Sequence, residues 1–389
     1  MSQFVDPRTN PEPPPSASRE PAAHGEQLQQ LIASCSAGRV YDVERWIQDG
    51  RPIQALDYKR PKRGSFLSPL RAAVRSRHQD VVLLLLCNGY RLDLEPADYD
   101  TVLDEALTTR AFDIMDLLLK WGADPTKLHV HHVLDTYQTD LIDRFWKAGL
   151  NYSADPSFVS YLAETANKPL YGWLKHNRSD QRLQDALDVA LCEAVKENKV
   201  KAVHLLRWAG GDPHRKVPSV GDLGRSDAWD EEMVSSGAQM AILYGRHELF
   251  DVLRVAELPD LDAQFSHVDD SATLKKLLVI RQPSDWSGII VNFIRQLGSF
   301  FWRESTWQAR AALEFIGTSG GKLTALPADR LGWCRRDLLA IKNADDFLWV
   351  LRWLRQEQHC NPVIYADLIR TPSMKKKMEA LNTGGRTIP

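Results

Sequence analysis

The sequence predicts an all-α fold in which helical hairpins stack into a solenoid, followed by a helical C-terminal domain or cap. Three observations indicate this architecture. Similar segments return after 33 residues, since Ala73 maps onto Ala106 and Gly89 onto Gly122. Each copy carries small residues on a first helix and paired leucines on a second helix, and then closes on a glycine that suits a helix end. A lone pair of such helices leaves its apolar face uncovered, so the core must come from stacked neighbours.

The repeated segments follow one another along the chain. The clearest copies begin at Ser68 with Ser-Pro-Leu-Arg-Ala-Ala-Val and at Thr101 with Thr-Val-Leu-Asp-Glu-Ala-Leu, and the second closes on Trp-Gly-Ala-Asp-Pro125. This period and lettering resemble the ankyrin repeat, whose consensus reads T-P-L-H-x-A-A, then G-H, an apolar helix and G-A-D. The resemblance implies six to seven repeats, with weaker copies at 29–50, 128–149, 189–210 and 236–257 and a degenerate copy at 157–176.

The chain is expected to have three parts. Residues 1–25 are rich in proline, serine and glutamate and predict a disordered tail, because they cannot bury enough apolar surface. Residues 26–280 form the predicted ankyrin-repeat domain, interrupted by long insertions at 51–67 and 214–235. Residues 281–389 lose the repeat lettering but keep apolar residues at helical spacing, which predicts a helical C-terminal domain with a short basic tail.

The composition is that of a globular protein. Of 389 residues 43% are hydrophobic, and 49 Lys and Arg stand against 51 Asp and Glu. The formal net charge of −2 gives no general attraction to nucleic acid or to an anionic membrane. The longest apolar run, 81–87, is far shorter than the roughly 20 residues that cross a bilayer, and no secretory signal is visible. We therefore expect a cytoplasmic protein without membrane contact, whose scattered cysteines are reduced.

Motifs that can carry chemistry are better explained by structural roles. Residues 317–321 have the letters of a nucleophile elbow, but a helix is expected before them, so Ser319 is interpreted as part of an interhelical loop. His129, His131 and His132 could share a metal ion, yet no cysteine or spaced carboxylate completes a ligand set. We therefore expect structural histidines, no metal, no cofactor and no enzyme activity.

The resemblance to ankyrin repeats implies that the protein binds a protein partner, as a scaffold or regulatory adaptor. Segments such as 37–46 and 167–174 are also similar to a group of uncharacterised bacterial ankyrin proteins, which implies a bacterial source. Family members bind their partners through a concave face built from fingers between repeats and from the exposed ends of the first helices. Carried onto this chain, these positions are Arg75, Ser76, Thr108, Thr109, Lys196, Glu197, Leu243 and Tyr244, with Tyr99, Lys127, Arg215 and Lys216 on fingers.

A basic insertion supports an alternative function. Lys59, Arg60, Lys62 and Arg63 would attract either an acidic protein surface or a phosphate backbone. Together with an Arg- and Trp-rich C-terminal part, they leave open a nucleic-acid-associated subunit of a larger complex, for example in defence or processing. No small-molecule substrate is expected. An enzyme within residues 281–389 is a further alternative, with Ser319 and His359 as the residues to test.

Overall fold

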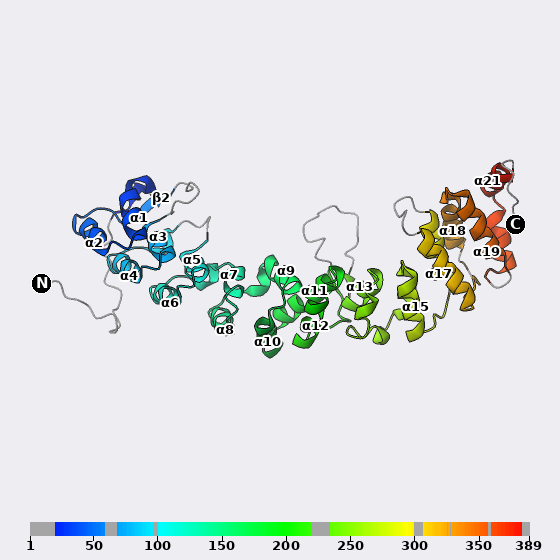
Figure 1. Ribbon diagram of the computed structural model, residues 1–389, viewed down its shortest axis with the longest axis horizontal. Helices are drawn as coiled ribbons and strands as arrows, with labels where there is room; N and C mark the ends of the chain where they lie inside the picture. Colours follow the sequence, from blue (N-terminus) through cyan, green and yellow to red (C-terminus); the bar gives the residue numbers. More distant parts are fainter. Residues whose placement is uncertain are drawn as a thin grey trace. The chain divides into compact units, whose positions relative to one another are not determined.

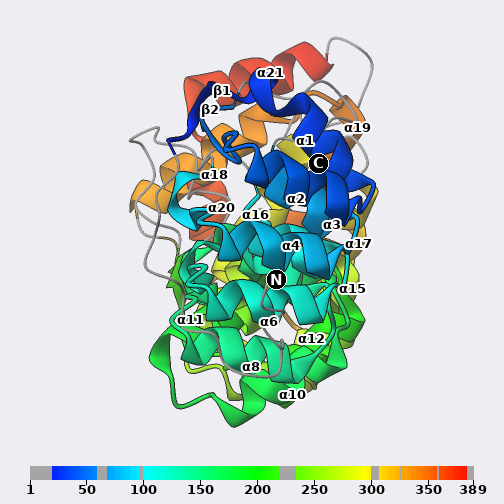
Figure 2. The ribbon, with the colours of Figure 1, turned by 90° about the vertical axis from the view of Figure 1, so that its left-hand side faces the viewer.

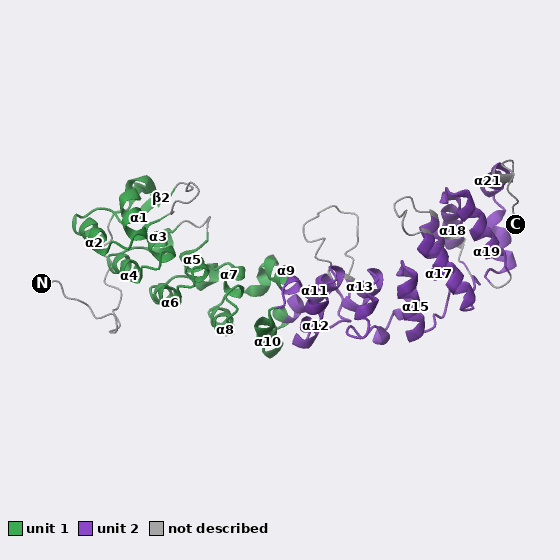
Figure 3. Cartoon of the chain, viewed as in Figure 1, with its two compact units in different colours: residues 1–161, 167–183 green, residues 162–166, 184–389 purple. Residues whose placement is uncertain are grey.

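The computed structural model describes residues 20–58, 68–95, 100–218, 234–298, 306–324, 326, 328–356 and 359–382. These residues form two compact units (Figure 3). The first unit comprises residues 1–161 and 167–183, and the second comprises 162–166 and 184–389. The division falls inside the predicted repeat array, whereas the domain boundary near residue 280 stays a prediction.

The first unit is a row of helical hairpins (Figure 1). First helices contact one another in chain order, α1 with α3, α3 with α5 and α5 with α7. Second helices also follow one another, and α2 contacts α4 as α4 contacts α6 (Figure 2). This stacking confirms the predicted all-α solenoid. The helices are α1 (Gln29–Ser36), α2 (Val40–Gln48), α3 (Pro69–Arg75), α4 (Gln79–Cys87), α5 (Val102–Thr108), α6 (Phe112–Lys120), α7 (Val130–Leu134), α8 (Thr139–Lys147), α9 (Pro156–Glu164) and α10 (Lys168–His176), with 3₁₀ turns η1 (Gly25–Leu28), η2 (Leu92–Leu94), η3 (Pro125–Lys127) and η4 (Tyr152–Ala154).

Side-chain caps start the first helices where the sequence copies begin. The Ser68 hydroxyl accepts a hydrogen bond from the Arg71 backbone N–H at 3.1 Å. Thr101 and Asp104 cap each other's backbone N–H groups in a capping box at the start of α5. His129, the residue before α7, makes no side-chain capping hydrogen bond, and this helix is the shortest of the row.

A left-handed residue makes the turn between the two helices in each of the first four hairpins. Glycine takes this position in the first hairpin, at Gly38, whereas the next three hairpins place Arg77, Arg110 and Tyr137 there, with φ of 59°, 55° and 58°. The chain then closes by a backbone hydrogen bond over five residues, as from Ala111 N to Ala106 O at 2.8 Å. Large side chains therefore stand at three successive turns where the first hairpin has glycine.

Two short strands pair at the end of the N-terminal segment that was predicted to be disordered. The strand β1 (Ala22–His24) pairs in parallel with β2 (Ala55–Asp57), so residues 22–25 are ordered although the tail was expected to reach residue 25. The reason is tertiary, because the insertion after α2 offers the backbone partner and the Ala22 side chain becomes buried against it. Residues 1–19 lie outside the described residues.

The second unit is also helical, apart from a short antiparallel pair formed by β3 (Val217–Pro218) and β4 (Val234–Ser235). In the copy at 236–257, two 3₁₀ turns replace the second helix, while Leu249 and Leu253 still fill the core at 0% exposure. Among the described residues, no helix has the length and apolar character to span a membrane. The elements are α11 (Gln181–Lys196), α12 (Val200–Ala209), α13 (Gly237–Leu243), η6 (His247–Leu249), η7 (Val255–Glu257), α14 (Leu261–Gln264), η8 (Phe265–His267), α15 (Ser271–Ile280), α16 (Ser287–Gly298), α17 (Thr306–Thr318), α18 (Ala328–Ala340), α19 (Ala344–Arg355), α20 (Pro362–Ile369) and α21 (Pro372–Asn382).

The helices after residue 281 pack around a common apolar centre. Helix α16 contacts both α17 and α18, and α18 contacts α20 and α21. Phe293, Phe347 and Leu351 are fully buried there. Lys377 donates hydrogen bonds to the carbonyls of Leu339 at 2.8 Å and Ile341 at 2.7 Å, and so caps the end of α18. Within the predicted basic tail, this lysine therefore has a structural partner.

Candidate functional site

The C-terminal ends of the first helices in the first unit lie next to one another, as the resemblance implied. The hydroxyls of Ser36 and Ser76, at the ends of α1 and α3, are 3.4 Å apart. Thr108 Oγ1, at the end of α5, is 3.3 Å from Nδ1 of His132 on α7. Arg75 and Thr108 are exposed, while Ser76 and Thr109 are half-buried. Four of the predicted binding residues are thus brought together on one edge of the unit.

Arg75 on this edge already has an acidic partner. Its Nη2 donates to Glu105 Oε2 at 2.8 Å, and its Nε donates to Glu105 Oε1. The Arg75 side chain is 51% exposed, whereas that of Glu105 is 7% exposed. The hydrogen bonds to Glu105 raise the pKa of Arg75. The guanidinium of Arg75 therefore links α3 to α5 through its ion pair with Glu105. The sequence alone did not reveal this pair.

The turn residues of the same hairpins extend this edge. Arg77, Arg110 and Tyr137 are exposed and occupy the same left-handed position in successive hairpins; we call these three residues the turn row. The Tyr137 side chain is 55% exposed. The prediction named the helix ends but missed the turn row. The signal that could have found it is that Arg77, Arg110 and Tyr137 stand where the copy at 29–50 has Gly38.

The predicted finger residues of the first unit differ in whether the structure describes them. Lys127 is exposed at the end of η3 and borders a cavity of about 490 Å³ near the start of α5. Arg71 and Glu95 also line this cavity and form a buried ion pair at 3.1 Å, with both side chains 7% exposed. The other predicted finger residue of the first unit and the four residues of the basic insertion lie outside the described residues, namely Tyr99, Lys59, Arg60, Lys62 and Arg63.

In the second unit, a buried carboxylate holds one predicted finger. Asp188 on α11 is fully buried and accepts hydrogen bonds from the backbone N–H of Asp212 at 2.7 Å and from Arg215 Nη1 at 3.1 Å. Arg215 Nη2 also pairs with Asp185 Oδ1 at 2.5 Å. Desolvation raises the pKa of Asp188 despite these partners. Arg215 therefore ties its finger to α11, while Lys216 Nζ lies 3.9 Å from Asp260 Oδ2.

The remaining predicted residues of the second unit gather at the ends of α11 and α13. Arg246 Nη2 donates to the Lys196 backbone carbonyl at 3.0 Å, which joins these two ends. Glu197 is exposed, Tyr244 is 40% exposed, and Leu243 is half-buried. The structure thus places Lys196, Glu197, Leu243 and Tyr244 on a second surface, within its own unit.

Ser319 and His359, the two residues named for an enzyme activity, lie in the helical C-terminal part. Helix α17 runs through Gly317 up to Thr318, so a helix leads into the loop that holds Ser319. This is the context expected for an interhelical loop and differs from the strand of a nucleophile elbow. His359 stacks on Trp353 with ring centroids 4.5 Å apart and lines an open cavity of about 620 Å³.

His359 provides a pH-dependent prediction for the second unit. The residue is 6% exposed, and its burial, together with the nearby charge of Lys322, lowers the pKa of His359 below its ordinary value. The folded state therefore favours the neutral ring, so stability is full above an unfolded-state pKa of about 6.5 and is lost as the pH falls below it. We expect the urea midpoint to fall between about pH 7.5 and pH 5 more in the wild type than in His359→Phe. Equal pH dependence of both proteins, measured by circular dichroism, would contradict this role.

Comparison with known proteins adds little to this description. No protein-family model matches the sequence, and no curated protein matches it. Among solved structures, the chain is similar to the crystal structure of the human ASB11 ankyrin repeat domain, at 16% sequence identity and a TM-score of 0.34. That match covers 65% of this chain and 98% of the ASB11 domain. The solenoid assignment rests on the helix contacts of the chain itself.

Proposed function

We propose that the protein is a non-enzymatic scaffold or regulatory adaptor that binds a protein partner along the turn row and the adjoining helix ends of the first unit. The observation that carries this proposal is the placement of Arg77, Arg110 and Tyr137 in left-handed conformation. A side chain in that conformation costs roughly 1–2 kcal/mol relative to a right-handed one. Strained residues of this kind are concentrated at functional sites.

The chemistry of the turn row fits a protein partner. Arginine and tyrosine are enriched among the residues that dominate binding energy at protein interfaces. Thr108 and Ser76 beside the row offer hydroxyl oxygens that can accept hydrogen bonds at its rim. In the second unit we assign a further contact surface to Lys196, Glu197, Leu243 and Tyr244, which combines charges with an exposed aromatic ring.

Glycine substitutions in the turn row separate binding from folding. Arg110→Gly removes the exposed side chain and also relieves the left-handed strain, so the variant should be at least as stable as the wild type. Once the partner has been identified by cross-linking and mass spectrometry, we expect Arg110→Gly to weaken its binding by about 10- to 100-fold. Arg45→Ala, which removes an exposed arginine from α2, is the matched control and should leave affinity unchanged.

Two results would reject this surface. The first is an unchanged affinity of Arg110→Gly and of Tyr137→Gly for the identified partner, measured by calorimetry. The second is loss of the complex after nuclease treatment, together with binding that depends steeply on salt, which would instead favour a nucleic-acid-associated role.

Arg75→Glu is a poor test of this surface, because it would place a second negative charge beside Glu105 and destabilise the fold.

A further inference from the structure

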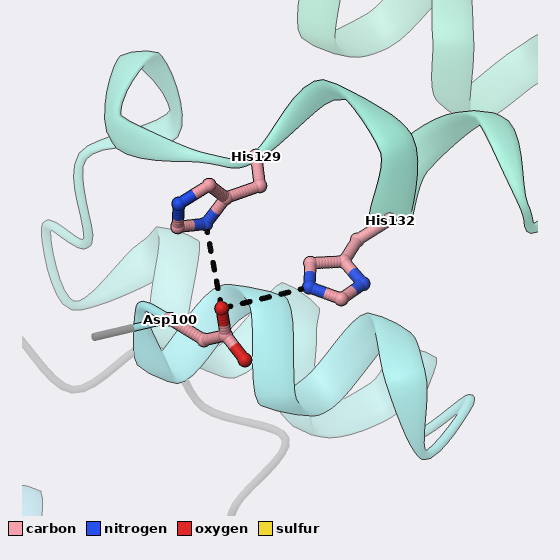
Figure 4. Close-up of side chains that lie close together, drawn as sticks. All are labelled: Asp100, His129 and His132. Carbon is pink, nitrogen blue, oxygen red and sulfur yellow. Dashed lines mark ion pairs between the residues drawn. The ribbon is translucent and has the colours of Figure 1, made fainter. Parts of the chain in front are cut away.

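Two histidines and an aspartate converge in the first unit between the start of α5 and helix α7 (Figure 4). Asp100 Oδ1 lies 3.7 Å from His129 Nδ1 and 3.8 Å from His132 Nε2. One ligand atom of each residue lies within 4.8 Å of the others. The carboxylate that the sequence analysis did not find for these histidines is therefore supplied by Asp100, 29 residues before His129.

The hydrogen bonds around His132 fix which of its nitrogens carries a proton. Thr108 donates its single hydroxyl proton to the Asp104 carbonyl at 2.8 Å, so Thr108 Oγ1 can only accept from His132 Nδ1, at 3.3 Å. In the neutral ring, Nε2 then carries a lone pair. This atom is shielded from solvent and has no hydrogen-bond partner among the described residues. It faces the Asp100 carboxylate, and two electron pairs in this position repel each other unless a proton or a metal ion lies between them.

His129 is held in place before any ion binds. Buried Asp104 accepts hydrogen bonds from the His129 backbone N–H at 2.9 Å and from its Nδ1 at 3.0 Å. Binding of a metal at Nδ1 would release the proton from this nitrogen and replace its hydrogen bond by attraction between the ion and the Asp104 carboxylate. When both imidazole rings are neutral, the carboxylates of Asp100 and Asp104 together carry two negative charges, which one divalent cation balances. Asp104 keeps its hydrogen bond to the His129 backbone N–H, and through this contact it is a positioning residue beside the three ligands.

We propose that Asp100, His129 and His132 bind a divalent transition-metal ion of the zinc type. Imidazole nitrogens favour such ions over magnesium or calcium, and Zn–N distances of about 2.0–2.1 Å place tetrahedral ligands about 3.3 Å apart. The two separations from Asp100, 3.7 and 3.8 Å, exceed this value by about half an ångström, and the ligand atoms of the two histidines lie within 4.8 Å of each other before an ion binds. The fourth position stays open to water. The ion would link the segment before α5 to α7, two elements of neighbouring hairpins.

Calorimetric titration of the full chain tests this site. The protein is prepared without a polyhistidine tag, treated with chelator and titrated with Zn²⁺, and we expect one ion per chain and a higher Tm with zinc than without it. Co²⁺ should give the visible absorption bands of a tetrahedral site with nitrogen and oxygen ligands. Absence of saturable binding would overturn the proposal.

Matched variants distinguish this site from adventitious binding. Asp100→Asn and His132→Gln should each weaken Zn²⁺ binding at least 10-fold, since each removes a ligand. His176→Gln is the control, because this exposed histidine on α10 lies outside the cluster and donates a hydrogen bond within its own helix, to the Gly172 carbonyl. If the wild type and His132→Gln bind Zn²⁺ equally, or if His176→Gln weakens binding as much as Asp100→Asn and His132→Gln do, the assignment is wrong. Circular dichroism of each variant confirms that it is folded.

Discussion

Replacing Asp104 by alanine is expected to lower the free energy of unfolding of the first unit by about 2–4 kcal/mol. The Asp104 carboxylate is fully buried and accepts hydrogen bonds from the Thr101 backbone N–H at 2.6 Å, the Thr101 hydroxyl at 2.9 Å and the backbone N–H of His129 at 2.9 Å. The substitution removes the capping box of α5, which contributes about 1 kcal/mol, and leaves the part-buried His129 N–H of the next hairpin without its acceptor, which costs about 1–3 kcal/mol.

Urea denaturation followed by circular dichroism measures this effect, and Asp116→Ala is its control. Asp116 pairs with Arg144, but its side chain is 58% exposed, so its removal should change stability by at most about 1 kcal/mol. Equal midpoints for the two variants would show that the Asp104 network does not connect α5 to the following hairpin. The result matters beyond stability, because the same carboxylate positions His129.

The sequence predicted the hairpins because their signals are local. Ser68 and Thr101 cap helices through contacts within one turn, and the buried Ala73 and Ala106 recur at the repeat interval. The strand β1 could not be predicted, because its partner β2 lies about 30 residues away in an insertion without repeat lettering. Pairing over such a distance leaves no periodic trace in the sequence.

In the candidate site, too, contacts between residues distant in sequence could not be predicted. Arg75, Ser76, Thr108 and Thr109 lie at the ends of α3 and α5, while their role in binding stays a prediction. It could not reveal that Arg75 is paired with Glu105 on the next hairpin, because that contact depends on how hairpins stack. The convergence of Asp100 with His132 has the same origin, since a fixed register between two hairpins brings them together. Contacts between repeats are therefore the information that one sequence does not contain.

The register between the first two hairpins can be tested at Gly38. This glycine has φ of +67°, and an added Cβ would lie 2.6 Å from Cε1 of His78, which belongs to the next hairpin. His78 Nε2 is in turn 3.1 Å from the Ser36 carbonyl oxygen, so the ring cannot move without losing this hydrogen bond. We expect Gly38→Ala to lower the free energy of unfolding by about 3–4 kcal/mol, from left-handed strain and the displaced ring together.

Gly50 separates the two contributions to this loss. It has a similar φ of +71°, but an added Cβ would have nothing within 4 Å, so Gly50→Ala should cost only the strain of about 1–2 kcal/mol. Adding His78→Ala should remove part of the penalty of Gly38→Ala, since the ring that obstructs the Cβ is then absent. Strictly additive effects in this double-mutant cycle, measured by urea denaturation, would mean that the two hairpins do not meet at this turn. Coupling of at least about 1 kcal/mol would place the Gly38 turn against His78, as the stacked solenoid requires.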